Sequence, residues 1–348
     1  MTTITKPKLF TSLGSVPWEY KIYSDLSEIA GLFCEWNDLL EESSCNKAFG
    51  SLEWYLASCR VQSSLSPYLV TASLGQKMVC LLPLALNTQN GTAIFPHFAN
   101  DYNDILLRDG NFALAADLLK FALSLQTGCR RIILSKLRPE SNCARTAGWL
   151  AENSGVKCSY HETEAYFRII LSGAFDDYLM SRGKLSRRNI KYALRKTHAN
   201  GLTSRELFPE EFDPSGIPET FIRLILDRQD DKCLFRLPHA QAFVREVLPP
   251  LFIKRNMRVF AMLQEKQIVA MDIYFVANNG LTAWNGGFLS AIERWSPGTA
   301  LIAFGIQQAI AMGVHEFDFG DGDEAYKRHW TNSEYTIGTM ELSPNLSM

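Results

Sequence analysis

The amino-acid sequence predicts an α/β fold of the mixed α+β kind, built from two similar units in tandem. Its 348 residues exceed what a single hydrophobic core usually holds, which favours two domains. Strand-like and helix-like segments alternate along the whole chain, and two stretches of the first half recur in the second half. We therefore expect each unit to hold a mixed, mostly antiparallel sheet flanked by helices.

Two recurrences carry the prediction of tandem units. The stretches Leu74–Leu84 and Leu263–Ile273 share a polar turn, a lysine and an apolar strand. Further along each half, an apolar helical pattern stops at a glycine and a strand follows, at Gly128 and at Gly313. A glycine just past the last periodic residue is a typical helix stop, because that position requires positive φ.

The two pairs are separated by similar lengths of chain, 189 residues from Leu74 to Leu263 and 185 from Gly128 to Gly313. This favours two diverged copies of one unit with a junction near 159–164. Chance similarity is the alternative, because strand–helix–strand patterns are common. We expect an N-terminal domain over 1–162 and a C-terminal domain over 163–348.

The composition is that of an ordinary globular protein, with 47% hydrophobic residues and a net charge of −2. Nucleic-acid binders usually carry a basic excess, so no DNA partner is expected. The eight cysteines show neither C-x-x-C pairs nor zinc-type spacing with histidine, which predicts reduced, mostly buried thiols and no metal site. No stretch resembles a signal peptide or a membrane span, so we expect a cytoplasmic protein.

The second half reads as a series of antiparallel strands that leads into a helix. Asn278-Asn279-Gly280 is a tight hairpin corner by its composition. The other expected elements are strands over 166–171, 259–263, 268–277 and 281–286, a loop over 287–296, a helix over 299–312 and a strand over 314–319. The first half should repeat this plan with a helix over 113–127 and a strand over 131–134.

The start of the predicted helix at Pro297-Gly298-Thr299-Ala300 is a candidate phosphate site. The first turn of a helix presents free backbone N–H groups and the positive end of the helix dipole. Such a terminus binds phosphate without a charged side chain. An ordinary helix cap is the alternative, because many helices begin with Pro-Gly.

A cluster of carboxylates and glycines follows this helix, from Glu316 to Asp323. In a strand, Glu316 and Asp318 share one face while Phe317 and Phe319 share the other. Two carboxylates on one face of a core strand are costly unless something polar lies beside them. The segment is therefore a candidate functional edge, and we expect Asp323 to act as the N-cap of a helix over 324–330.

These motifs together resemble the CelD-like acyltransferases of the GNAT superfamily. The resemblance rests on Ser296-Pro297-Gly298, on Asp318-Phe319-Gly320-Asp321-Gly322, and on Tyr326-Lys327 followed by Trp330. The basic segment Lys184–Ile190 is similar to the family's basic helix near the start of its acyltransferase half. Roughly residues 165–335 are covered, and the order and spacing of the motifs are more specific than any one of them.

The resemblance implies a GNAT fold in both tandem domains and transfer of an acyl group from acyl-CoA to a primary amine. The turn Pro297–Ala300 would hold the CoA pyrophosphate. Many GNAT proteins carry Q/R-x-x-G-x-G/A there, whereas this chain has Trp295 in the first position. An acyl-phosphopantetheine carrier protein is therefore an alternative donor, and a fatty acyl group is one candidate for the group transferred.

Paired GNAT-like units also resemble the Fem-type peptidyltransferases. That resemblance implies aminoacyl transfer from tRNA as an alternative function, although the near-neutral charge makes an RNA partner the lesser expectation. A non-catalytic binding module that keeps the fold is a third.

The acceptor amine arrives protonated, since a lysine-type amine has a pKa near 10.4, and a base must take its proton. We expect Asp318 or Asp321 to be that base and Tyr326 to protonate the departing thiolate. Backbone N–H groups of Trp284, Asn285 and Gly286 would polarise the thioester carbonyl. Lys327 would bind a phosphate or carboxylate; a solvated helix face is its alternative.

A basic segment from Arg182 to Arg205 holds eight Lys and Arg residues and no acidic residue. Five of them lie on one helical face: Lys184, Arg187, Arg188, Lys191 and Arg195. We expect Arg187 and Arg188 to contact an anionic substrate, with the CoA phosphates, an acidic carrier protein or RNA as candidates. A solvated face is the alternative.

In the first half, Asn100-Asp101-Tyr102-Asn103-Asp104 lies in a loop before a short strand. By the duplication, this loop corresponds to the stretch from Asn285 in the second half. Asp101 and Asp104 are therefore candidates to bind a cationic amine acceptor, and ordinary Asx-turn chemistry is the alternative.

Overall fold

The computed structural model describes residues 18–124, 127–153, 156–227, 233–277 and 279–344. Two compact units make up the chain: unit 1 is Met1–Glu164 with Thr336–Met348, and unit 2 is Ala165–Tyr335. The C-terminal strand segment thus belongs with the N-terminal unit, a difference from the expected domain ranges 1–162 and 163–348. The chain start and Asn278 of the predicted hairpin corner lie outside the described residues.

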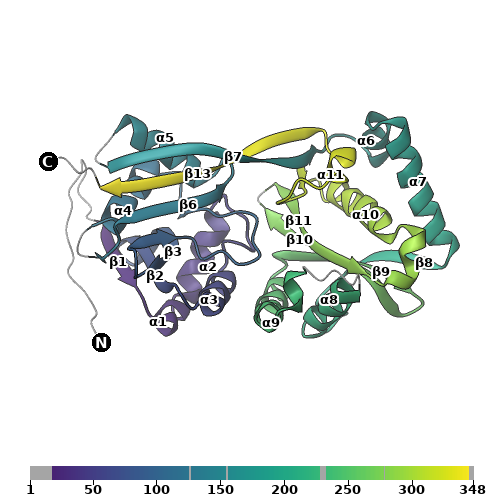
Figure 1. Cartoon of the computed structure of the whole chain (residues 1–348), viewed down its shortest axis with the longest axis horizontal. Helices are drawn as coiled ribbons and strands as arrows, with labels where there is room; N and C mark the ends of the chain where they lie inside the picture. Colours follow the sequence, from purple (N-terminus) through teal and green to yellow (C-terminus); the bar gives the residue numbers. More distant parts are fainter. Residues whose placement is uncertain (1–17, 125–126, 154–155, 228–232, 278, 345–348) are drawn as a thin grey trace. The chain divides into compact units, whose positions relative to one another are not determined.

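Unit 1 is a mixed sheet with helices on both faces (Figure 1). Its strand order is β1-β2-β3-β4-β6-β13, with β5 on β3. Its elements are β1 (Glu19–Tyr23), α1 (Leu26–Ala30), α2 (Phe33–Glu42), α3 (Leu52–Val61), β2 (Ser66–Leu74), β3 (Lys77–Asn87), β4 (Thr92–Ile94), β5 (Leu106–Leu107), α4 (Phe112–Ala122), β6 (Arg131–Leu137), α5 (Asn142–Glu152), the first part of β7 (Val156–Ile170) and most of β13 (Ser333–Pro344).

The apolar run of β3 is buried because helices cover both faces of this strand. Leu82 and Leu84 pack with α4 and α5 in one core, whereas Leu81 and Ala85 pack with α2 and α3 in a second core. The helix predicted over 113–127 is α4, which ends at Ala122.

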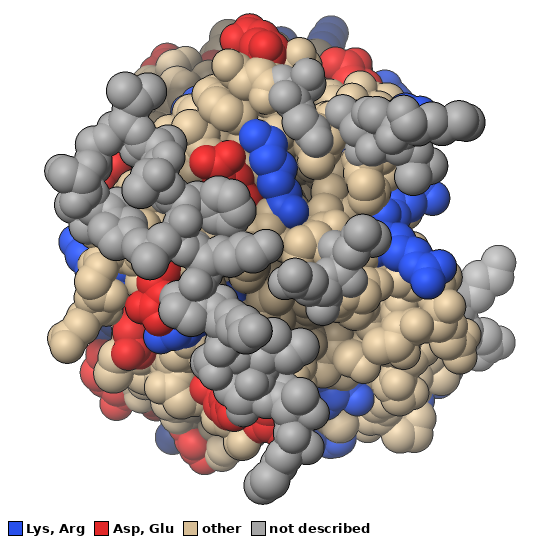
Figure 2. Space-filling view, turned by 90° about the vertical axis from the view of Figure 1, so that its left-hand side faces the viewer, with Lys and Arg blue, Asp and Glu red and all other residues tan. Residues whose placement is uncertain are grey.

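On the face drawn in Figure 2, lysines and arginines are interspersed with aspartates and glutamates, in keeping with the near-neutral charge.

Unit 2 holds strands in the order β7-β12-β11-β10-β9-β8. Its elements are the end of β7, α6 (Phe175–Ser181), α7 (Lys184–Ala199), β8 (Leu202–Leu207), α8 (Gly216–Asp227), a 3-10 helix (Leu234–Arg236), α9 (Pro238–Ile253), β9 (Met257–Gln264), β10 (Gln267–Ala277), β11 (Gly280–Phe288), a 3-10 helix (Ser290–Trp295), α10 (Pro297–Ala311), β12 (Glu316–Asp318), α11 (Lys327–Trp330) and the start of β13.

The helices of unit 2 also cover both faces of its sheet (Figure 1). Tyr274 of β10 faces Gly305 of α10, and the next residue, Phe275, packs against Trp284 on the opposite face. Trp284 in turn stacks on Phe221 of α8, with ring centroids 5.4 Å apart. A period of two therefore sends alternate residues of β10 to different helical layers.

The two units share one order of elements. In unit 1, the antiparallel hairpin β2–β3 is followed by β4, α4 and then β6, which pairs in parallel with β4. In unit 2, the hairpin β9–β10 is followed by β11, α10 and then β12, which pairs in parallel with β11. Both units are thus mixed, mostly antiparallel sheets with flanking helices, as the sequence predicts. Gly313, with φ of 70°, follows α10 as the expected helix stop.

Candidate functional site

In unit 2, the pairing between strands β11 and β12 extends over three residue pairs. The parallel register joins Gly280–Thr282 to Glu316–Asp318, where β12 ends, while β11 continues to Phe288. Where a strand extends past the end of its neighbour, its backbone N–H and C=O groups on that edge must find other hydrogen-bond partners. The predicted strand over 314–319 is therefore shorter than expected, and β11 continues past the end of β12.

A β-bulge lies on this part of β11. Ile273 pairs with Asn285 and Tyr274 pairs with Ala283, so Trp284 is an extra residue in the register. Bulges bend a strand and re-aim its backbone groups. The Trp284 ring is held between aromatic neighbours of the core on the α8 side. The predicted oxyanion segment, Trp284 to Gly286, thus lies at the bulge.

Asp272 of β10 lies directly opposite Gly286. A Cβ atom at Gly286 would fall 2.0 Å from Asp272 Oδ1. Burial of the carboxyl raises the pKa of Asp272 to about 7, and a hydrogen bond donated by Tyr274 Oη at 3.2 Å lowers it in part. The residue as a whole stays partly exposed. A carboxyl that titrates near neutral pH suits proton transfer.

Sequence reasoning missed Asp272, although a usable signal was present. Asp272 is the single charged residue in the otherwise apolar strand Ile268–Ala277. A charge inside a buried strand requires a polar partner or a function. Its partner Tyr274 stays protonated, because burial raises its pKa well above the usual value and the Asp272 charge acts in the same direction.

Helix α10 begins as predicted, with Pro297 at its first position. The preceding residue, Ser296, has left-handed backbone angles (φ 56°), and its carbonyl accepts a hydrogen bond from the Ala300 N–H. The N–H groups of Gly298 and Thr299 point to the helix start. A Cβ atom at Gly298 would meet only the Phe288 ring, at 3.6 Å, so space remains beside this turn.

Asp318 is buried at the end of β12, with 1% of its surface exposed. Its Oδ1 accepts a hydrogen bond from the Gly320 N–H at 2.8 Å, and its Oδ2 accepts one from the hydroxyl of Tyr335 at 2.5 Å. Glu316, on the same face, forms an ion pair with Arg168 at 2.8 Å. The two carboxylates that the sequence marks as costly are therefore both engaged by groups of this chain.

Lys327 is also buried, at 2% exposure. Its ammonium donates to the main-chain carbonyl oxygens of Asp321 and, at 3.2 Å, Gly322, and it forms an ion pair with Glu324 at 2.9 Å. The alternative of a solvated helix face is thus wrong. Lys327 therefore stabilises the loop that follows β12, because several main-chain carbonyl oxygens of that loop accept hydrogen bonds from its ammonium group.

The residues around Lys327 lie nearer to solvent. Tyr326 is 46% exposed, and its ring lies 6.4 Å from that of Phe319. Its hydroxyl is near enough to Tyr274 to raise that residue's pKa. The helix expected from Glu324 with Asp323 as its N-cap begins instead at Lys327 with Tyr326 at the cap. Asp323 instead forms an exposed ion pair with Arg328 at 2.7 Å.

The predicted basic face lies on α7. Arg188 is exposed, as are Lys184, Lys191 and Arg195, whereas Arg187 is partly buried and donates to the carbonyl oxygen of Met180 at 3.0 Å. On the opposite face of α7, the buried side chains are those of Ile190, Ala193 and Thr197. An exposed row of like charges is thus available to an anionic partner.

In unit 1, Asp101 is partly buried, and Asp104 lies just before β5. The carboxylate of Asp104 accepts backbone hydrogen bonds from Ile105, Cys143 and Asn142 at 2.8, 2.9 and 3.0 Å. Two of these donors are the first residues of α5, so Asp104 stabilises the start of that helix. Burial raises the pKa of Asp104 to about 6, and the three backbone bonds oppose that shift.

Within the described residues, no helix is long and apolar enough to span a membrane.

Comparison with known proteins bears on the fold and family. Residues 184–328 match the family described as "Acetyltransferase (GNAT) domain". No curated protein matches the chain.

Two solved structures show the same fold over nearly the whole chain. The crystal structure of FemX is 11% identical, with a TM-score of 0.62, and the match covers 93% of this chain and 96% of FemX. The structure of L-PGS from Bacillus licheniformis is 12% identical, with a TM-score of 0.57, and covers 89% of this chain and 90% of that one. Residues 184–328 are therefore a GNAT acetyltransferase-family domain, within a chain that has the Fem-like tandem GNAT fold.

Proposed function

We propose that this chain is an N-acyltransferase, which moves an acyl group from acyl-CoA or an acyl-phosphopantetheine carrier to a primary amine. The observation that carries the proposal is that β11 continues past the end of β12. The start of α10 and the Asp272 carboxyl lie beside the same strand. The pantetheine arm would extend along β11 where that strand continues past the end of β12. A nearby helix start receives its phosphates.

Each part has a distinct task in the proposed reaction. The N–H groups of Gly298 and Thr299 bind pyrophosphate oxygens, with Pro297 and Ala300 shaping the turn. Backbone N–H groups at the Trp284 bulge stabilise the thioester oxygen as negative charge develops on it. Because Gly286 has no side chain, the Asp272 carboxylate lies directly against β11, next to the proposed position of the thioester.

The proton balance assigns the remaining groups. The nitrogen forms a bond to the thioester carbon, the carbon–sulfur bond breaks, and the thiol leaves; of the two protons that the ammonium loses, one goes to the base and the other replaces the proton that Tyr326 gives to the thiolate. Asp272 takes the amine proton, because its carboxyl titrates near neutral pH. Asp321 is the other candidate base, because the predicted base Asp318 is buried and both its oxygens are engaged by Gly320 and Tyr335; Tyr326 supplies a proton to the departing thiolate.

The test is thiol release measured with DTNB across acyl-CoA chain lengths, together with mass spectrometry of the amide product. Primary amines and an acyl-carrier-protein donor complete the panel. Release that depends on both donor and amine supports the proposal. Absence of release with every donor and amine contradicts it.

A second function is supported by the exposed basic row on α7 and by the Fem-like fold: aminoacyl transfer from tRNA, with α7 contacting RNA. Binding that weakens steeply with salt supports this function, and an Arg188→Ala, Arg195→Ala double variant should reduce the salt slope. Absence of RNA binding at low salt contradicts it.

A third function, a binding module without catalysis, predicts that Asp321→Asn and Tyr326→Phe leave cellular function unchanged.

A further inference from the structure

The strand in unit 1 that corresponds to β11 is interrupted. Ile94 of β4 pairs with Ala85, and an unbroken antiparallel strand would then place residue 98 opposite Leu81. Leu106 of β5 occupies that position instead, so the chain makes an excursion of eight extra residues. The excursion contains Asn100 to Asp104. It builds one wall of a small pocket that opens to solvent.

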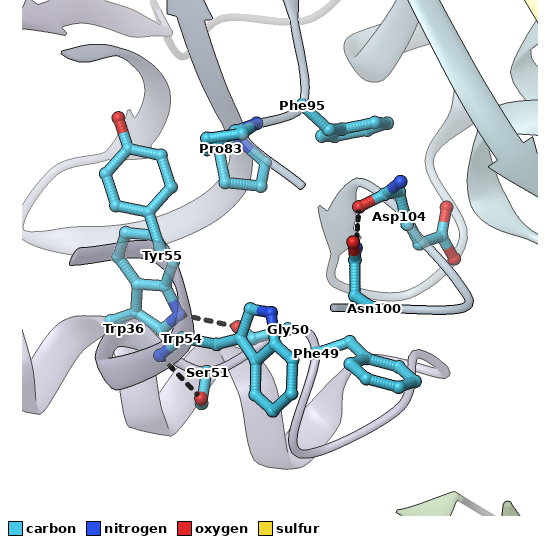
Figure 3. Close-up of a pocket in the computed structure, with 12 residues that line it drawn as sticks. Trp36, Phe49, Gly50, Ser51, Trp54, Tyr55, Pro83, Phe95, Asn100 and Asp104 are labelled. Atoms are coloured by element: carbon cyan, nitrogen blue, oxygen red, sulfur yellow. Dashed lines mark hydrogen bonds between the residues drawn. The ribbon is translucent and has the colours of Figure 1, made fainter. Parts of the chain in front are cut away.

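Aromatic side chains form most of this pocket. In Figure 3, Trp54 and Phe49 lie across from Phe95 and Pro83, and Trp36 lies beside Trp54. These groups are fixed: Trp36 Nε1 donates to the Gly50 carbonyl oxygen at 2.9 Å, and the rings of Phe49 and Trp54 meet edge to face at 4.9 Å. A fixed set of π-faces is a preorganised environment for a cation.

Asn100 supplies a polar atom to the same pocket. The residue is 4% exposed, and its amide nitrogen donates to Asn103 Oδ1 at 2.6 Å and to the Tyr102 carbonyl oxygen at 3.2 Å. These two acceptors fix which end of the amide is nitrogen. The other end, Oδ1, is buried and has no hydrogen-bond partner in the described part of the chain. A buried acceptor of this kind requires a donor.

The side of the pocket that holds Asn100 also holds Asp104 (Figure 3). At neutral pH its carboxyl is mostly ionised, since it titrates at about 6. Three backbone N–H groups hold this carboxylate in place. This side of the pocket therefore presents a hydrogen-bond acceptor that lacks a donor, and the Asp104 carboxylate lies behind it, pointing away from the rings (Figure 3).

We propose that this pocket of unit 1, lined by Trp36, Phe49, Trp54 and Phe95 with Asn100 and Asp104 at one side, binds an ammonium group. An ammonium donates a hydrogen bond to Asn100 Oδ1, while its charge is stabilised by the aromatic faces and by Asp104. A neutral hydroxyl group satisfies Asn100 but gains nothing from the rings or the charge. Identifying this ammonium group as part of the acceptor amine rests on the proposed function, whereas the binding itself does not.

The test uses the full chain and a matched pair of probes, n-propylammonium chloride and propan-1-ol, with binding measured by saturation-transfer NMR and titration calorimetry. We expect saturable binding of n-propylammonium and binding of the alcohol that is about tenfold weaker or more. Sodium chloride at equal ionic strength controls for general charge effects.

Three variants locate the site. Asn100→Leu removes the acceptor, and Phe49→Ala removes a partly buried ring of the pocket wall. Each should weaken n-propylammonium binding about tenfold, whereas Asn153→Ala on the exposed end of α5 should not change it. Melting temperatures establish that each variant is folded.

The outcomes separate the pocket from the acyl transfer. Equal binding of ammonium and alcohol, absence of saturable binding, or binding that survives both Asn100→Leu and Phe49→Ala overturns the proposal and leaves an ordinary water-filled hollow. Pocket binding in a chain that releases no thiol leaves the site standing and contradicts the proposed function. Acyl transfer in a chain whose pocket does not bind n-propylammonium supports the proposed function and overturns the pocket proposal.

Discussion

The Asp272 carboxylate occupies the space that a side chain at position 286 would fill. The two residues are direct partners across β10 and β11, and a Cβ atom at Gly286 would lie 2.0 Å from Asp272 Oδ1. Glycine at 286 is therefore a steric requirement of the carboxylate, although its φ is not in the left-handed region.

Gly286→Ala should displace the Asp272 carboxylate or push the strands apart. We expect acyl transfer to fall sharply and the melting temperature to drop, because the contact is with a short side chain on a packed sheet. Gly148→Ala is the control, since a Cβ atom there meets no neighbour. Equal activity and stability of the two variants would show that the contact is relieved at little cost.

Asp272→Asn should change how activity depends on pH. The wild-type kcat/KM should rise with pH through about 7, where the Asp272 carboxyl loses its proton. The variant should lose about 10²–10⁴ in rate together with this limb of the profile. A profile that keeps its limb near pH 7 in Asp272→Asn assigns the base to another residue, with Asp321 as the next candidate.

The same carboxyl should affect stability in a defined direction. Its pKa is raised in the folded chain, so the folded state binds the proton more tightly than the unfolded state does. The free energy of unfolding should therefore fall as the pH rises from about 4 to about 7, by at most about 4 kcal/mol from this group. Asp272→Asn should remove most of that slope in urea titrations, whereas Asp117→Asn on α4 should preserve it.

Gly298→Ala should fold normally but bind the donor less well. The added methyl group makes only ordinary contact with Phe288, at 3.6 Å, while it covers backbone N–H groups at the start of α10. We expect a severalfold rise in KM for acyl-CoA with little change in kcat or melting temperature. An unchanged KM would mean that the phosphates bind elsewhere.

Lys327→Met should destabilise the loop after β12. The substitution keeps the volume and removes the charge on which the carbonyl oxygens of Asp321 and Gly322 converge. Leaving such groups without a donor costs about 1–3 kcal/mol, which differential scanning calorimetry can detect. Arg328→Met, at an exposed ion pair on the same helix, should cost less than about 1 kcal/mol.

Much of the fold follows from local sequence patterns. Apolar periodicity and a glycine stop predict α10 and its end just before Gly313, and the recurrence at Leu74 and Leu263 marks the same hairpin in both units. The helix start at Pro297 is equally local, since a helix terminus presents its N–H groups wherever it lies. These features depend on residues near one another in the chain.

Tertiary structure decided the features that depend on distant partners. The pairing of β13 with β6 joins residues about 200 positions apart, and no local pattern reports it. Whether a carboxylate is available depends likewise on what packs beside it: Asp318 is held by Tyr335, while Asp272 faces a glycine. The pocket of unit 1 arises because an excursion of the chain brings Asn100 beside Trp54, and only the packed chain places these side chains together.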